Sequence, residues 1–99
     1  ITNHDFPVFT NNTDRIVVKA DGKVGIGTTS PATELDVSGD VTVSGDLTMT
    51  GTGAIQMPVG TTAQRPASPS QGMIRYNTTT SHFEGYDGSA WVHLETQYG

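Results

Sequence analysis

The chain has 99 residues, of which 33% are hydrophobic and 15% charged, and its formal net charge at pH 7 is −5. So few apolar residues disfavour a compact monomeric enzyme, because a chain this short needs most of them to build a core of its own. The acidic balance argues against binding to nucleic acid, and the absence of cysteine excludes disulfides and thiolate metal sites. The longest apolar run, Ile16–Val18, is too short to insert into a membrane. Thr, Val and Ile outnumber Leu and Ala, which favours strands over helices.

Residues 1–30 are predicted to hold an irregular N-terminal segment followed by a β-hairpin. Two β-rich runs flank Asp21-Gly22, a pair typical of a two-residue hairpin turn in which both central residues have positive φ. With these two residues at the centre of the turn, Val17 is expected to face Ile26. Because the chain does not begin with Met, we also expect it to be a piece of a longer protein.

Residues 31–59 carry a repeat of six residues, seen as VSGDVT at 37–42 and VSGDLT at 43–48. Apolar residues fall in pairs two apart, so each pair lies on one face of an extended segment before Gly-Asp turns the chain. One chain has too few hexads to enclose a β-helical core by itself. We therefore expect three identical chains to wind around one axis as a short triple β-helical shaft. The predicted trimer core consists of Leu35, Val37, Val41, Val43, Leu47 and Met49.

Two further segments complete the predicted organisation. Residues 60–71 contain no Val, Ile, Leu or aromatic residue and are expected to form a linker or a loop that follows the surface. Residues 72–99 show three alternating segments separated by two turns, which predicts a C-terminal antiparallel β-meander. The second turn is expected to have Asp87 and Gly88 at its centre.

That predicted turn places Glu84 opposite Trp91, on the face that also carries Tyr86, while Phe83 and Val92 share the other face. Aromatic rings on one face could stack on sugars, although in a small module they are more often the core. If one face is buried, the other is free to recognise a ligand. Glu84, Tyr86 and Trp91 are therefore the candidate receptor-contact surface.

The same register places His82 opposite His93. Two imidazoles per chain, tripled by symmetry, could bind a metal ion on the axis, but a polar pair across two strands is the favoured interpretation. No metal site and no cofactor are predicted.

Two of the carboxylates could act as a glycosidase pair, because sugar hydrolysis commonly uses two of them. The four aspartates beside glycine are explained by turn chemistry: Asp21, Asp40, Asp46 and Asp87. Glu84 lies among aromatic residues but has no evident second carboxylate. No catalytic residue is predicted, and the chain is not expected to be an enzyme.

Two stretches resemble a known family. VGIGTTSP at 24–31, followed by LDVSG at 35–39, resembles a segment found repeatedly in tail fibres and tailspikes of tailed bacteriophages, often upstream of a self-cleaving chaperone domain. The C-terminal sequences GMIRYN at 72–77 and FEGYDG at 83–88 resemble a module common in such fibres. The catalytic portion of the chaperone domain has no counterpart here, so the resemblance does not imply autoproteolysis.

The repeat and the resemblance together imply an all-β, elongated, intertwined homotrimeric fibre. The expected function is that of a structural and adhesive segment of a bacteriophage tail fibre, extracellular and part of the virion, which contributes to attachment to the bacterial host. The expected partners are copies of the same chain, other virion proteins and a bacterial surface receptor such as a polysaccharide. The alternatives are a fragment of a polysaccharide-depolymerising tailspike and a non-viral bacterial fibrous adhesin.

Overall fold

The computed structural model describes residues 4–94, so the two ends of the predicted N-terminal and C-terminal segments lie outside the described residues. The structure is all-β, as expected, and divides into two compact units, Ile1–Met49 and Thr50–Gly99. Each unit contains one four-stranded sheet, and a single 3-10 turn is the only helical element within residues 4–94. The described part of the chain holds no helix with the length and hydropathy that a membrane span requires.

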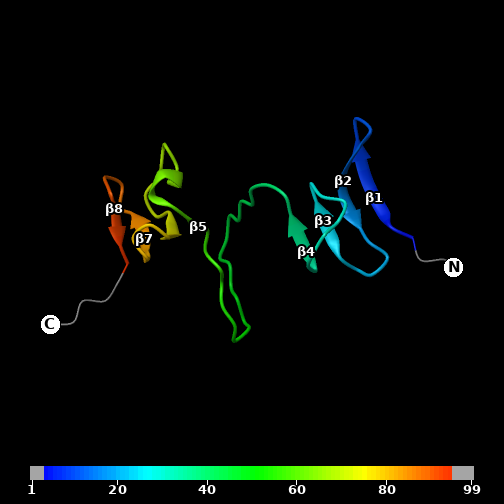
Figure 1. Cartoon of the computed structure of the whole chain (residues 1–99). Coiled ribbons are helices and arrows are strands. Elements are labelled where there is room, and N and C mark those ends of the chain that lie inside the picture. The colour runs from blue at the N-terminus through cyan, green and yellow to red at the C-terminus, as the bar shows by residue number, and fades with distance from the viewer. Residues whose placement is uncertain (1–3, 95–99) are drawn as a thin grey trace. The chain divides into compact units, whose positions relative to one another are not determined.

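The N-terminal sheet has the order β1-β2-β3-β4 (Figure 1). Strands β1 (Phe6–Thr10), β2 (Thr13–Val18) and β3 (Val24–Ile26) form an antiparallel series. Strand β4 (Leu35–Val37) then pairs with β3 in the parallel direction, so the sheet is mixed. The connection between β3 and β4 is short and contains no regular element.

Strand β1 was not predicted, because the first 14 residues show no sustained alternation of apolar and polar side chains. The structure joins it to β2 through Asn11 and Asn12, which both have positive φ, of 50° and 57°. Asparagine tolerates this left-handed conformation better than most residues, and two such residues in succession make a hairpin turn that suits the twist of the strands. The N-terminal segment is therefore a hairpin and not an irregular stretch.

The predicted hairpin at Asp21-Gly22 is confirmed, but its predicted register was wrong by one residue. The strands pair Val17 with Gly25 and Ile16 with Ile26. Only Gly22 has positive φ, 94°, and its N–H donates to the Lys19 carbonyl at 2.9 Å. The loop is therefore a β-turn followed by a left-handed glycine, one residue longer than the two-residue turn.

Register places an unbroken row of apolar side chains on one face of this sheet, which we call the apolar face of the N-terminal sheet. Directly paired residues share a face, and the pairing runs through all four strands. The face consists of Phe6, Val8, Ile16, Val18, Val24, Ile26, Leu35 and Val37.

The opposite face of the sheet is closed by the chain itself. Val17, which is only 3% exposed, pairs across it with Gly25. A Cβ atom built on Gly25 would come within 3.4 Å of the ring of Pro31, which is itself buried. The connection after β3 therefore lies over this face, and glycine is needed at position 25 to let it approach.

No strand is assigned to residues 38–58, where the six-residue repeat lies (Figure 1). All residues from 38 to 56 are exposed. Extended hexads cannot satisfy their backbone hydrogen bonds within one chain, so a strand assignment would require neighbouring chains. The triple β-helical shaft remains a prediction.

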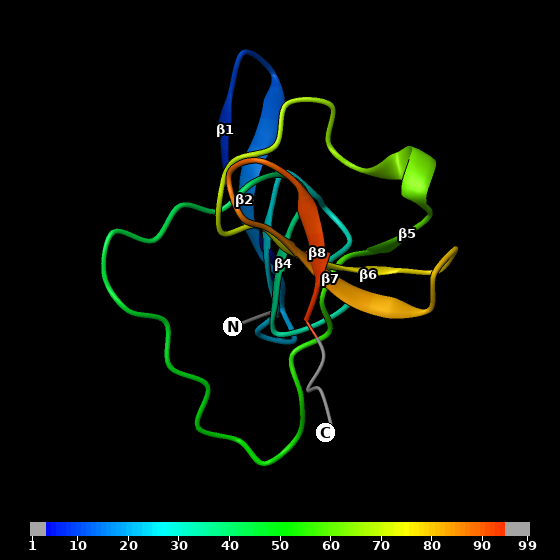
Figure 2. The ribbon, with the colours of Figure 1, turned by 90° about the vertical axis from the view of Figure 1, so that its left-hand side faces the viewer.

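The C-terminal sheet has the order β5-β6-β7-β8 (Figures 1 and 2). Strand β5 (Val59–Gly60) pairs in parallel with β6 (Ile74–Asn77), and a 3-10 turn (Thr62–Gln64) follows β5. Strands β7 (His82–Tyr86) and β8 (Trp91–His93) continue from β6 in the antiparallel direction, which confirms the predicted meander.

The second turn of the meander also differs from its prediction. The structure pairs Tyr86 with Trp91 and Glu84 with His93, two residues away from the expected register. The turn lies one residue later, because the Asp87 N–H donates to the Ala90 carbonyl at 3.1 Å. A shift of two residues leaves every side chain on its predicted face, since side chains alternate with a period of two.

We expect Gly25→Ala to destabilise the N-terminal unit. The added Cβ would overlap the Thr28 carbonyl oxygen, so the backbone of the connection after β3 must move. Overpacking of this kind costs about 1–3 kcal/mol. The matched control is Gly51→Ala, because a Cβ there meets nothing within 4 Å. Thermal unfolding should show a lower midpoint for the first variant only, and equal midpoints would contradict the tight packing of this connection.

Candidate functional site

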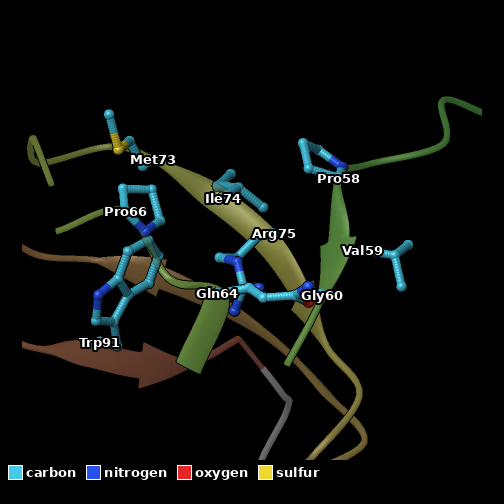
Figure 3. A pocket seen from close by; sticks show the side chains of 9 residues that line it. All are labelled: Pro58, Val59, Gly60, Gln64, Pro66, Met73, Ile74, Arg75 and Trp91. Atoms are coloured by element: carbon cyan, nitrogen blue, oxygen red, sulfur yellow. The ribbon is translucent and has the colours of Figure 1, made fainter. Parts of the chain in front are cut away.

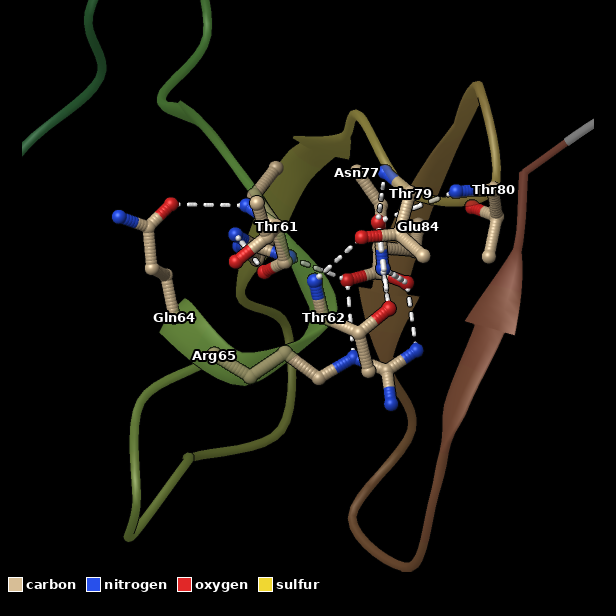
Figure 4. A network of polar contacts seen from close by, with 9 residues as sticks. Thr61, Thr62, Gln64, Arg65, Asn77, Thr79, Thr80 and Glu84 are labelled. Atoms are coloured by element: carbon tan, nitrogen blue, oxygen red, sulfur yellow. Dashed lines mark hydrogen bonds and ion pairs between the residues drawn. The ribbon is translucent and has the colours of Figure 1, made fainter.

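The interior of the C-terminal unit is a cluster of polar side chains around Glu84 (Figure 4). Glu84 projects from β7 and its side chain is completely buried. Its Oε1 atom accepts hydrogen bonds from Arg65 Nη2 at 2.7 Å and from Asn77 Nδ2 at 3.1 Å. Its Oε2 atom accepts from Arg65 Nε at 3.0 Å and from Arg75 Nη1 at 2.6 Å. The carboxylate is thus held by a two-pronged guanidinium contact, a second guanidinium and an amide.

Arg75 reaches Glu84 directly across the sheet, because the two residues are paired in β6 and β7. Its other terminal nitrogen, Nη2, donates to the Thr61 carbonyl at 2.9 Å and so ties β6 to the segment after β5. A Cβ on Gly60 would lie 2.6 Å from this nitrogen. Glycine at position 60 therefore leaves the space that the buried guanidinium occupies.

Asn77 connects the cluster to the turn between β6 and β7. Its Oδ1 atom accepts hydrogen bonds from the N–H groups of Thr79 at 2.9 Å and Thr80 at 3.3 Å. Its amide nitrogen donates to the Thr62 hydroxyl at 2.9 Å and to Glu84. One asparagine thereby supplies hydrogen-bond partners to the turn, to the 3-10 segment and to the buried carboxylate.

These contacts lower the pKa of Glu84 to about 2. The hydrogen bonds from Arg65 are the largest cause, those from Asn77 and Arg75 add to it, and burial opposes it. A carboxylate with such a pKa stays ionised at neutral pH, so it holds no proton to give as a general acid. Its lone pairs are directed at four donors of the same chain, which makes the group a structural centre.

The inclusion of Glu84 in the receptor-contact surface was therefore wrong, since no ligand can reach a fully buried side chain. Residues 60–71 are likewise more than a linker, because they supply Arg65 to the cluster and lie against the sheet. This agrees with the second of the two expectations for that segment, a loop that follows the surface.

Tyr86 and Trp91 lie on the same face as Glu84, as predicted, and both are half-buried. Their ring centroids are 5.3 Å apart, and the Arg65 guanidinium carbon lies 5.7 Å from the Trp91 ring. Trp91 also lines a groove of about 400 Å³ (Figure 3). Its other walls are mostly apolar and include Pro58, Pro66 and Met73. An aromatic ring at the wall of a groove is suited to stacking against a ligand.

His82 and His93 do not pair directly, contrary to the predicted register, because His93 lies opposite Glu84. They are diagonal neighbours on one face, with their rings stacked at a centroid distance of 4.2 Å. Within residues 4–94 no group of three or more histidine, aspartate or glutamate side chains is arranged to hold a metal ion.

The other face of the C-terminal sheet is apolar and faces outward. Tyr76 and Phe83 pair across β6 and β7 with a centroid distance of 5.0 Å, edge to face. Phe83 is 49% exposed, and Ile74 and Val92 on the same face are also exposed. The expectation that the aromatic residues form the core of this module was therefore wrong for the single chain, whose interior is polar.

The predicted trimer-core residues fall into two groups. Leu35 and Val37 are on β4 and belong to the apolar face of the N-terminal sheet. The other four lie in the hexads or directly after them and are between 51% and 74% exposed: Val41, Val43, Leu47 and Met49. None of these four is covered by another described part of the chain.

The arginine and asparagine residues around Glu84 were not singled out from the sequence. Arg65 is 19 residues away from Glu84, so no local pattern relates them. The sequence did contain a signal for Arg75 and Asn77. They alternate with Ile74 and Tyr76 along a strand, so Arg75 and Asn77 must lie on the same face of the sheet. Polar residues at every second position of a strand, facing a glutamate on the next, indicate a buried charge network.

Comparison with known proteins found one match. A family model described as "Phage tail like trimerisation region" matches residues 25–98. No curated protein and no solved structure matches the chain. The matched residues include Gly25 and Ile26 of β3, the whole of β4, the hexads and the whole described part of the C-terminal unit.

We expect the stability of the protein to fall as the pH is lowered from about 4.5 towards 2. The pKa of Glu84 is about 2 in the folded chain and near 4.5 when the chain unfolds, so the folded state is stabilised above pH 4.5 and loses that stabilisation as the carboxylate is protonated. The loss is on the order of 3 kcal/mol. Denaturant unfolding across this pH range measures it.

Glu84→Gln should flatten this acid dependence and destabilise the protein at pH 7 by about 3–5 kcal/mol, because two guanidinium groups lose their buried counter-charge. Glu34→Gln is the control, since Glu34 is exposed and lies in the other unit. An unchanged acid dependence in Glu84→Gln would show that the cluster is not its source.

Proposed function

Because this chain belongs to the family of phage tail like trimerisation regions, we propose that it is a structural segment of a bacteriophage tail fibre that associates as a homotrimer and contributes to attachment to the host surface. The observation that carries the proposal is the exposure of the apolar hexad residues. No other part of the described chain packs against these side chains. Membership of a trimerisation family accounts for this, because two further copies would supply the surface that packs against them.

Exposed apolar side chains at regular spacing are typical of a shared core. Burying a Val, Leu or Met side chain contributes roughly 1.5–3 kcal/mol, and each chain offers four of them between residues 41 and 49. Val41 and Val43 lie two residues apart, so in an extended segment they face the same direction. Three such segments around one axis would bring their apolar sides together and leave the intervening threonines outside.

The same arrangement would supply hydrogen-bond partners for the hexad backbone. A lone extended segment leaves its backbone groups to water, whereas adjacent segments from two other copies can pair with it. This supports a shaft in which strands form between chains, in accord with the absence of an assigned strand within residues 38–58 of the single chain.

The described residues favour a structural and adhesive role over catalysis. The most deeply buried carboxylate, Glu84, is held as a charged centre by Arg65, Arg75 and Asn77. Adhesion would use the groove wall at Trp91, together with Tyr86. A flat apolar ring beside a groove is a common way to recognise a sugar unit of a bacterial surface polysaccharide.

We expect Val43→Asp to abolish trimer formation. In the proposed shaft the substitution places three carboxylates close to one axis, where burial of an unpaired charge costs several kcal/mol. The variant should sediment as a monomer at micromolar concentrations at which the unchanged protein is a trimer. Thr42→Asp is the matched control, because residue 42 faces away from residues 41 and 43. A trimeric Val43→Asp variant would contradict the shaft.

Trp91→Ala should weaken binding of the protein to host cells or to their purified surface polysaccharide by about tenfold or more, as expected for loss of an aromatic contact at the centre of a site. Binding to host envelope is measured first for the unchanged protein. The thermal midpoint of the variant separates lost contact from lost folding, because Trp91 also lies against Arg65. Unchanged binding would remove Trp91 from the contact surface.

A further inference from the structure

We propose that the apolar face of the N-terminal sheet, defined above, is a second interface among three copies of this chain, so that three sheets enclose a core ahead of the hexad shaft. The inference rests on the proposed homotrimer and extends it to strands β1 and β2, which precede the matched residues 25–98.

The eight residues that define the face are all apolar. On the same side, Thr10 and Thr13 pair beyond the bulge after Val8, so the face becomes polar only at the end of the β1–β2 hairpin. Its outer members are well exposed, Phe6 by 66% and Leu35 by 60%, and the central residues Ile16 and Ile26 are exposed by 37% and 40%. Soluble monomers rarely leave a continuous apolar surface of this kind in contact with water.

The connection after β3 covers the other face, whereas no described segment of the N-terminal unit covers this one. Pro31 and Thr28 lie beside Gly25, on the side of Val17. A sheet with one closed face and one open apolar face is half of a two-layer arrangement, and the missing layer must come from elsewhere.

Continuity identifies that layer as further copies of the same chain. Ile26, Leu35 and Val37 belong to this face and also lie within the residues matched by the trimerisation family. Hydrogen bonding in the sheet fixes β1 and β2 beside them. If three copies meet at β4 and the hexads that follow it, the rest of the same face is carried to the same axis.

Charge agrees with this occupant. Each chain carries a net charge of −5, so three copies repel one another except where uncharged surfaces meet, and the eight residues of this face are uncharged.

The experiment introduces single cysteines into the full chain, which contains no cysteine of its own. Ile16→Cys places one thiol at the centre of the face, and Ser30→Cys places one in the exposed connection outside it. In the trimer, alkylation by a maleimide should be at least tenfold slower at position 16 than at position 30. Adding Val43→Asp, which is expected to separate the copies, should remove the difference.

A second variant tests the energetic role of the face. Ile16→Lys should raise the concentration needed for trimer formation by at least tenfold in sedimentation equilibrium, because three ammonium groups would meet in an apolar core, whereas Ser30→Lys should leave it unchanged. A circular dichroism spectrum like that of the unchanged protein shows that the variant is folded. If the Ile16→Lys variant does not fold, alkylation of the Ile16→Cys variant still tests whether this face is an interface.

The outcomes distinguish this inference from the proposed function. If the unchanged protein is a monomer, the homotrimer itself is refuted. If it is a trimer in which the thiol at position 16 reacts as fast as the thiol at position 30, the homotrimer stands and the second interface is overturned. Slow reaction at position 16 in the trimer, lost on separation of the copies, supports it.

Discussion

One constraint governs this chain: its apolar side chains lie on single faces, and within either unit the described residues place almost nothing against them. Within residues 4–94 the only large hydrophobic side chain that is buried is that of Val17. The C-terminal unit instead has a polar interior, in which Arg65 and Arg75 hold Glu84. Since burial of apolar surface is the main driving force of folding, most of that force must become available when copies meet. Folding and association are therefore expected to be strongly coupled.

The N-terminal unit shows which local sequence signals are sufficient to predict a turn or a strand and which are not. Alternating runs around Asp21-Gly22 predicted a hairpin, but the residue pair alone did not distinguish a two-residue turn from a longer one ending in a glycine. The difference of one residue changes which side chains share a face. Strand β1 escaped prediction because its turn, Asn11-Asn12, contains no glycine and its own residues alternate poorly. Its existence depends on pairing with β2, which is a property of the sheet.

The C-terminal unit shows the same limit at longer range. Three strands and their order were predictable from turns and alternation, and the faces were correct even though the register was off by two. The role of Glu84 was not predictable, because it depends on Arg65, which arrives from a segment without strand-forming residues. A carboxylate among aromatic neighbours suggested recognition, whereas the cations that bind it lie elsewhere in the sequence. Prediction succeeded where neighbours in sequence decide the outcome and failed where a distant partner does.

The near identity of the two hexads has a consequence for how copies could align. A chain displaced by six residues would present VSGDLT where its neighbours present VSGDVT, with Leu47 in the place of Val41 and little loss of apolar contact. Repeats therefore specify the spacing of a shaft but not its phase. The two sheets on either side of the hexads do not repeat, and copies that are out of phase in the hexads could not match at both sheets. The two sheets would thus determine which hexads of the three copies lie side by side.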